Sequence, residues 1–143
     1  MSKWNKTRFA EHMTDNCSRE VAKVGNAIIN FSEKHADEIS WGRGSDHGTL
    51  TFRCNSDFGV LPLFHMTSLG SLNIQVNFLR SKEVPKQVML DMVRKLESNF
   101  LREYDSIMYD VDTFEPMNEL FFTSTQVEKF LNTMEGCCYR LRQ

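Results

Sequence analysis

The residues best suited to bind a ligand lie in a glycine-rich segment, 41–48, which reads WGRGSDHG. Glycine permits positive φ and a close approach of the backbone to another surface, so such a loop can turn several amides toward an anion. Arg43 would add positive charge there, and His47 would make the contact sensitive to pH. The segment lacks the G-K-[ST] ending of a P-loop and the G-x-G-x-x-G spacing of a dinucleotide site. Two interpretations stay open: an anion-binding loop, and a hairpin connection shaped by glycine with Trp41 in the core.

A second set of polar side chains alternates with apolar ones at 49–54 and again at 71–78. Period-two alternation is typical of half-buried strands, so the polar residues should share the side of the sheet that faces away from the core. Amides donate and accept hydrogen bonds, and an arginine presents a planar fork to phosphate or carboxylate. A plain solvated sheet face is the alternative interpretation. The predicted ligand-binding residues are Arg43, His47, Arg53, Asn73, Gln75 and Asn77.

The remaining reactive residues predict no catalytic, metal or cofactor site. Asp46 and His47 are neighbours in sequence, but adjacent residues on a strand point in different directions. The four histidines contain no H-E-x-x-H pair, and we interpret His65 as a satisfied residue at a strand end rather than a ligand. The acidic stretch 105–115 does not fit an EF-hand loop, and the four cysteines contain no C-x-x-C pair. We therefore expect no catalytic residues, no metal and no cofactor.

Three helices are predicted to support these residues. Apolar residues spaced by three and four predict a helix over 18–36, with a helical turn or a separate short helix upstream at 9–17. Pro85 is typical of the first turn of a second helix. The pattern Thr125-x-x-Glu128 predicts a capping box at the start of the last helix, in which each side chain binds the other residue's backbone amide.

Four strands are predicted, at 39–41, 49–54, 60–66 and 71–78. The links between them have hairpin lengths, which favours an antiparallel meander. Because proline lacks the amide hydrogen of a central ladder, we expect the third strand to lie at an edge or to be bulged at Pro62. Residues 110–122 are predicted to form a loop with one short extended piece. The order α-β-β-β-β-α-α predicts a single α+β domain over residues 1–143, an antiparallel meander of about four strands with three helices packed on one face.

Composition and charge bound the class of protein. The chain has 143 residues, of which 41% are hydrophobic and 25% charged, as is typical of one globular domain. Its formal net charge is −2, whereas proteins that bind duplex DNA through phosphates are usually basic. Five basic and three acidic residues give 41–86 a charge of +2, and six against ten give 87–143 a charge of −4. We expect any anion site in the middle of the chain, no membrane partner, and a cytoplasmic location with reduced cysteines.

Three segments together resemble a small uncharacterised bacterial α+β domain family that is loosely associated with nuclease-like proteins. They are WGRGSDHGTLTF at 41–52, LNIQVNFL at 72–79 and STQVEKFLNTM at 124–134, and the similarity spans residues 18–141. The resemblance implies an accessory domain that helps to engage DNA or a partner protein and does not cut. The 143 residues contain no nuclease module, which departs from that architecture, and the family supplies no catalytic residues to transfer.

Three functional hypotheses follow. The first is a non-catalytic binding module that engages nucleic acid or a protein through the glycine-rich loop and the polar sheet face. The second is a small enzyme that holds an anionic metabolite on the same loop while His47 moves a proton. The third is a structural or regulatory homodimer, because Phe121 and Phe122 cannot both face one core if the chain is extended there, so one of them would cover a partner.

Overall fold

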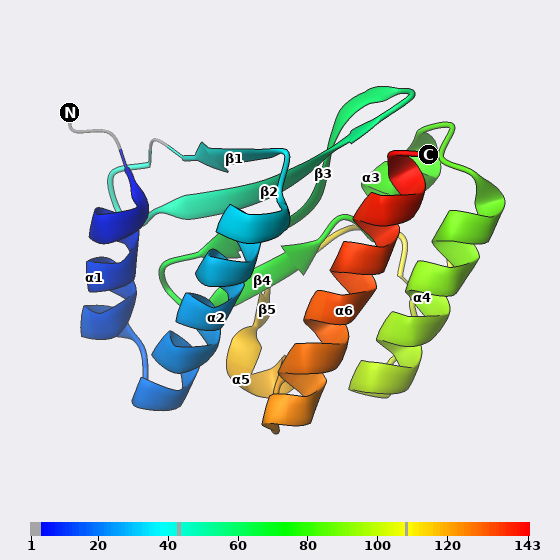
Figure 1. Cartoon of the computed structure of the whole chain (residues 1–143). Coiled ribbons are helices and arrows are strands. Elements are labelled where there is room, and N and C mark those ends of the chain that lie inside the picture. Colours follow the sequence, from blue (N-terminus) through cyan, green and yellow to red (C-terminus); the bar gives the residue numbers. More distant parts are fainter. Residues whose placement is uncertain (1–3, 43, 108) are drawn as a thin grey trace.

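The computed structural model describes residues 4–42, 44–107 and 109–143. It confirms the predicted α+β class: an antiparallel sheet with long helices in one layer against it (Figure 1). Five strands and six helices lie in the described part of the chain, in place of the predicted four and three. The strands are β1 (Glu38–Trp41), β2 (Thr49–Ser56), β3 (Gly59–Thr67), β4 (Ser71–Ile74) and β5 (Glu115–Pro116). The helices are α1 (Lys6–Asn16), α2 (Arg19–His35), α3 (Val76–Ser81), α4 (Lys86–Phe100), α5 (Met117–Leu120) and α6 (Ser124–Leu141).

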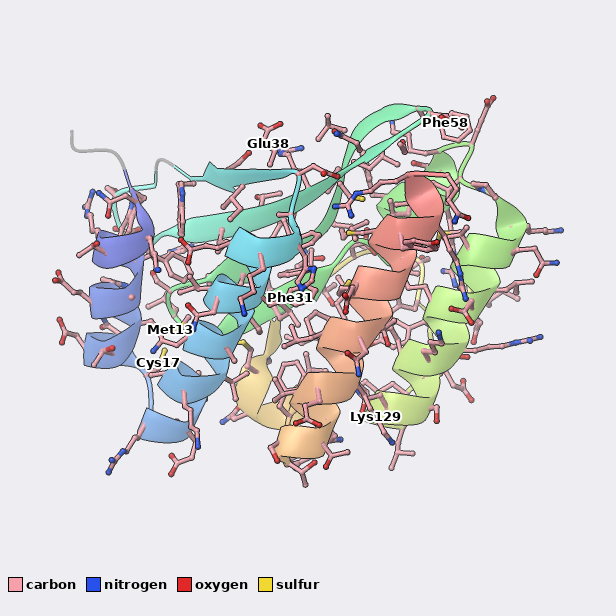
Figure 2. The ribbon with its side chains drawn as sticks, in the orientation of Figure 1. Met13, Cys17, Phe31, Glu38, Phe58 and Lys129 are labelled. Carbon is pink, nitrogen blue, oxygen red and sulfur yellow. The ribbon has the colours of Figure 1, made fainter. Side chains whose placement is uncertain are left out.

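The strands form a meander in the order β1-β2-β3-β4-β5, with every pair antiparallel. The pairing of β2 with β3 shifts register between Phe52 and Arg53, where Arg53 pairs with Pro62. This confirms the bulge expected at Pro62. Strand β4 pairs with β3 only from Phe64 onward, so no ladder partner on that side requires an amide hydrogen at Pro62. Figure 2 shows Phe58 at the tip of this β2–β3 hairpin, at the far end from α1.

The prediction of a strand over 71–78 is wrong beyond Ile74, because the chain turns at Gln75 into the short helix α3. The apolar residues Val76 and Leu79 are both fully buried, and their spacing of three places them on one face of a helix, whereas in a strand they would point to opposite faces. The Asp112 carboxylate accepts hydrogen bonds from the Asn77 and Phe78 amides at 2.8 and 3.0 Å, which satisfies the first turn of α3. A distant residue therefore decides the structure of this segment.

Figure 1 shows α1, α2, α6 and α4 side by side on one face of the sheet, and the core lies between the two layers. A chain of aromatic contacts joins the layers. Phe31 of α2 stacks on Phe52 at 5.6 Å between ring centroids, and Phe52 stacks on Phe64 at 5.1 Å. Phe64 in turn meets Phe130 of α6 edge to face at 5.4 Å. Because these strand residues point at the helices, their sequence neighbours must point to the opposite face.

The helix starts show which polar residues satisfy the free backbone amides. Ser18 caps α2 by accepting a hydrogen bond from the Val21 amide. The capping box predicted at Thr125 and Glu128 is wrong by two residues, since Thr123 and Gln126 form it. The predicted loop over 110–122 contains the expected extended piece, β5, and also the one-turn helix α5, which was not predicted.

Candidate binding surface on the helix-free face of the sheet

One line of polar side chains crosses four neighbouring strands on the face away from the helices. Ser40 pairs with Thr51, Thr51 with His65, and His65 with Asn73, so each is the cross-strand neighbour of the next. Directly paired residues of antiparallel strands lie on the same face. We call these four residues the polar row.

Two hydrogen bonds fix side chains of the polar row. Thr51 Oγ1 lies 2.7 Å from His65 Nδ1, and Gln75 Nε2 donates to Asn73 Oδ1 at 2.8 Å. The Gln75 side chain also lies close enough to His65 to influence the pKa of the imidazole. Thr51, Asn73 and Gln75 are buried and His65 is half-buried. The row is therefore a fixed set of donors and acceptors and not a set of freely rotating surface groups.

Arg53 is the cation beside the polar row. Its Nε donates to Ser40 Oγ at 2.9 Å, and this is the only hydrogen bond of its side chain to a described residue. The terminal guanidinium nitrogens therefore retain their donors for a ligand. Glu38 is the register partner of Arg53 on the same face, yet these two described side chains form no ion pair. The guanidinium is the group at this surface best suited to bind a carboxylate or a phosphate.

Burial lowers the pKa of His65, and the positive charge of Arg53 lowers it further. The Asp112 carboxylate and the nearby Gln75 side chain act in the opposite direction and are outweighed. His65 is consequently neutral near pH 7. A neutral imidazole can donate or accept at Nδ1 according to its tautomer, and either role suits the contact with the Thr51 hydroxyl.

The segment between α4 and β5 borders the polar row. The ring of Phe114 lies 6.5 Å from the ring of His65 and is 49% exposed. Asp112 anchors this segment to α3, and Asn77 donates from its side chain to the Tyr109 carbonyl at 3.0 Å. The surface thus combines a planar cation, a hydrogen-bonding row and an accessible aromatic ring.

The glycine-rich loop is held by contacts inside the protein. The Trp4 indole donates to the Gly44 carbonyl at 2.6 Å, and the Gly48 amide donates to Ser68 Oγ at 2.8 Å. A Cβ atom at Gly48 would lie 2.7 Å from the Trp4 ring and 2.9 Å from the Phe9 ring. Trp41 is half-buried and packs on Phe9 with 5.5 Å between ring centroids. These contacts favour the interpretation of this loop as a hairpin connection shaped by glycine.

The structure brings together three of the six predicted site residues. Arg53 and Asn73 lie on the helix-free face, and Gln75 joins them directly after β4. Asn77 lies in α3, not in a strand, and its side chain is engaged with Tyr109 and Arg80. The two loop residues remain apart from this group. His47 is half-buried between β1 and β2 and forms no hydrogen bond or ion pair with a described residue, while Arg43 lies outside the described residues.

Four members of this surface are not among the six predicted site residues: Ser40, Thr51, His65 and Phe114. His65 does not lie at a strand end, as was predicted, but inside β3 with strands on both sides. The alternation of His65 with the buried Phe64 and Met66 was the available signal for its position. Ser40 and Phe114 carried no comparable signal, because strand register and the path of a long loop place them.

Several comparisons and searches bear on this surface. Within the described residues, no three or more His, Cys, Asp or Glu side chains are grouped closely enough to hold a metal ion. None of the described helices has both the length and the apolar character that a bilayer crossing requires. Comparison of the chain with protein-family models, curated proteins and solved structures found no match. The family resemblance noted from the sequence therefore stays a prediction.

Proposed function

We propose that this chain is a non-catalytic binding domain, and that its ligand contacts the helix-free face of the sheet around Arg53 and the polar row. The observation that carries the proposal is the half-buried side chain of Arg53. Ser40 orients its guanidinium, and the terminal nitrogens form no hydrogen bond with a described residue. Orientation before binding reduces the entropy that a ligand contact costs. The buried hydrogen bonds of Thr51, His65, Asn73 and Gln75 give the surface a fixed pattern.

The ligand class that we propose is a single-stranded nucleic acid. Sheet surfaces that bind single strands combine aromatic rings, on which bases stack, with cations that meet the phosphates. Phe114 supplies an accessible ring beside His65, and Arg53 supplies a cation across the polar row. The buried Asn73 and Gln75 amides hydrogen-bond each other, so they fix the strands beneath the ligand and do not themselves contact it.

A protein partner is the second candidate, and the distribution of charge favours it. The whole chain has a formal charge of −2, and the carboxylates of Glu38 and Asp112 lie close to the proposed surface. Carboxylates repel a polyanion, whereas arginine and aromatic side chains are enriched in protein interfaces. An enzyme that used His47 to move a proton would need a second titrating group within hydrogen-bond reach of it, and no described residue forms a hydrogen bond or an ion pair with His47.

The test is fluorescence anisotropy with labelled single- and double-stranded DNA and RNA at low and physiological salt. Arg53→Ala should weaken single-strand binding about tenfold and make the affinity less dependent on salt, because one cationic contact is lost. Arg94→Ala is the matched control, since Arg94 is exposed on α4 in the helical layer. Its affinity should equal that of the wild type.

Two outcomes would contradict the proposal, one for the assignment of the surface and one for the class of ligand. Equal loss of affinity in Arg53→Ala and Arg94→Ala would indicate nonspecific attraction and would overturn the assignment of the surface. Absence of binding to every nucleic acid at low salt would overturn the nucleic-acid proposal. The search would then turn to proteins that bind the wild type and not the Arg53→Ala variant.

The variant Arg43→Ala tests the glycine-rich loop separately. If the loop binds the ligand, as the sequence predicts, the variant should bind more weakly while its melting temperature stays nearly unchanged.

A further inference from the structure

An apolar groove lies between α2 and α6 on the helical side of the molecule, and the polar row plays no part in it. Its volume is about 400 Å³. Val24 and Ala27 of α2 form one wall, and Val127 and Leu131 of α6 form the other. Grooves of this size with apolar walls are typical of binding sites.

An exposed aromatic ring stands at one end of this groove. Phe122 is 75% exposed, the highest value among the described aromatic residues. Its backbone is fixed, because the Phe122 amide donates to Gln126 Oε1 at 2.6 Å and the preceding Phe121 is buried against Phe100 and Phe130. A large apolar side chain on a fixed backbone loses little entropy when it is covered.

The rim of the groove carries charges of both signs. Glu20 and Lys23 lie along the α2 side, and Glu128 lies along the α6 side. All three side chains belong to exposed residues and form no ion pair with a described residue. A hollow, a protruding ring and both signs of charge on one patch meet the requirement of a two-fold contact, in which one surface is complementary to itself.

We propose that the occupant of this groove is a second copy of the chain, which forms a two-fold symmetric dimer. Phe122 of each copy covers the groove of the other, and Lys23 of each copy faces the acidic rim of the other. The helix-free sheet faces then lie away from the contact, so the dimer presents two copies of the polar row to ligands. The observation that favours a second copy as the occupant is charge complementarity: the rim that carries Lys23 also carries Glu128, so each copy supplies the carboxylate that the lysine of the other requires.

The test is sedimentation equilibrium from low micromolar to near-millimolar protein. The wild type should pass from monomer to dimer mass over this range. Phe122→Ser should weaken dimerisation at least about tenfold, because it removes the covering ring. Lys23→Glu should also weaken it, because the rim then becomes wholly acidic. Both substitutions are at exposed positions, so far-UV circular dichroism and the melting temperature should stay unchanged.

Tyr139→Ser is the matched control, since Tyr139 is a 65% exposed aromatic residue of α6 that does not line the groove. Its dimerisation constant should equal that of the wild type. A monomer mass for the wild type at every concentration would overturn the proposal. A dimer that persists unchanged in both Phe122→Ser and Lys23→Glu would overturn it as well, by placing the contact elsewhere. Sedimentation equilibrium does not measure nucleic-acid binding. If the nucleic-acid proposal fails, the dimer proposal is therefore unaffected.

Discussion

Replacement of Gly48 by alanine separates the two interpretations of the glycine-rich loop. The added Cβ would lie 2.7 Å from Trp4 Cε3 and 2.9 Å from Phe9 Cδ2, against ordinary contacts of 3.4–4 Å. Both rings are almost completely buried, with exposures of 2% and 0%, so neither can move aside without repacking. Overpacking of this kind costs about 1–3 kcal/mol. For a chain of this length we expect the melting temperature to fall by about 3–10 °C.

Differential scanning calorimetry with an alanine control checks this expectation. Gly136→Ala places the same methyl group inside α6, where nothing lies within 4 Å, and should stabilise the protein by about 0.5–1 kcal/mol through its higher helix propensity. If Gly48→Ala keeps the wild-type melting temperature but loses ligand binding, the steric argument is refuted. Gly48 would then serve the approach of a ligand and not the packing of Trp4.

Two further predictions concern pH and capping. Because the pKa of His65 is lowered in the folded protein, the unfolded chain binds more protons below about pH 6.5, and stability should fall as the pH decreases through that region, by at most about 1.4 kcal/mol per pH unit. Urea unfolding of His65→Gln should show a shallower decrease, and an equal one would contradict the burial argument. Thr123→Ala should destabilise the protein by about 1 kcal/mol through loss of the cap, whereas Thr125→Ala should change the free energy of unfolding little. If urea unfolding shows a larger loss of stability for Thr125→Ala than for Thr123→Ala, the capping box predicted from the sequence would be the correct one.

The sequence predicted the elements whose periodicity is unambiguous. The helix expected at 18–36 is α2, because its apolar stripe at spacings of three and four has no strand alternative. The segment 71–78 was ambiguous, since Val76 belongs both to an alternating pattern and to a helical one. Its helical structure depends on Asp112, which is 35 positions away from Asn77, and no local pattern reveals such a partner.

The candidate surface was predictable to the extent that alternation assigns a face. Arg53 and Asn73 alternate with buried residues, and the structure places both on the helix-free face. Alternation does not fix register, so the alignment of Ser40, Thr51 and His65 across three strands could not be derived from one sequence. Asn77 was assigned to this face only because the strand was predicted to continue past Ile74.

Side-chain chemical-shift mapping tests the proposed binding surface most directly. The Arg53 Nε–H, the Asn73 and Gln75 amide groups and the His65 ring each give a resonance that reports on the helix-free face. On titration with a single-stranded oligonucleotide, these signals should move together and saturate, while side-chain signals of α4 and α6 should stay in place. Shifts confined to the helical layer, or no shifts at low salt, would contradict the account.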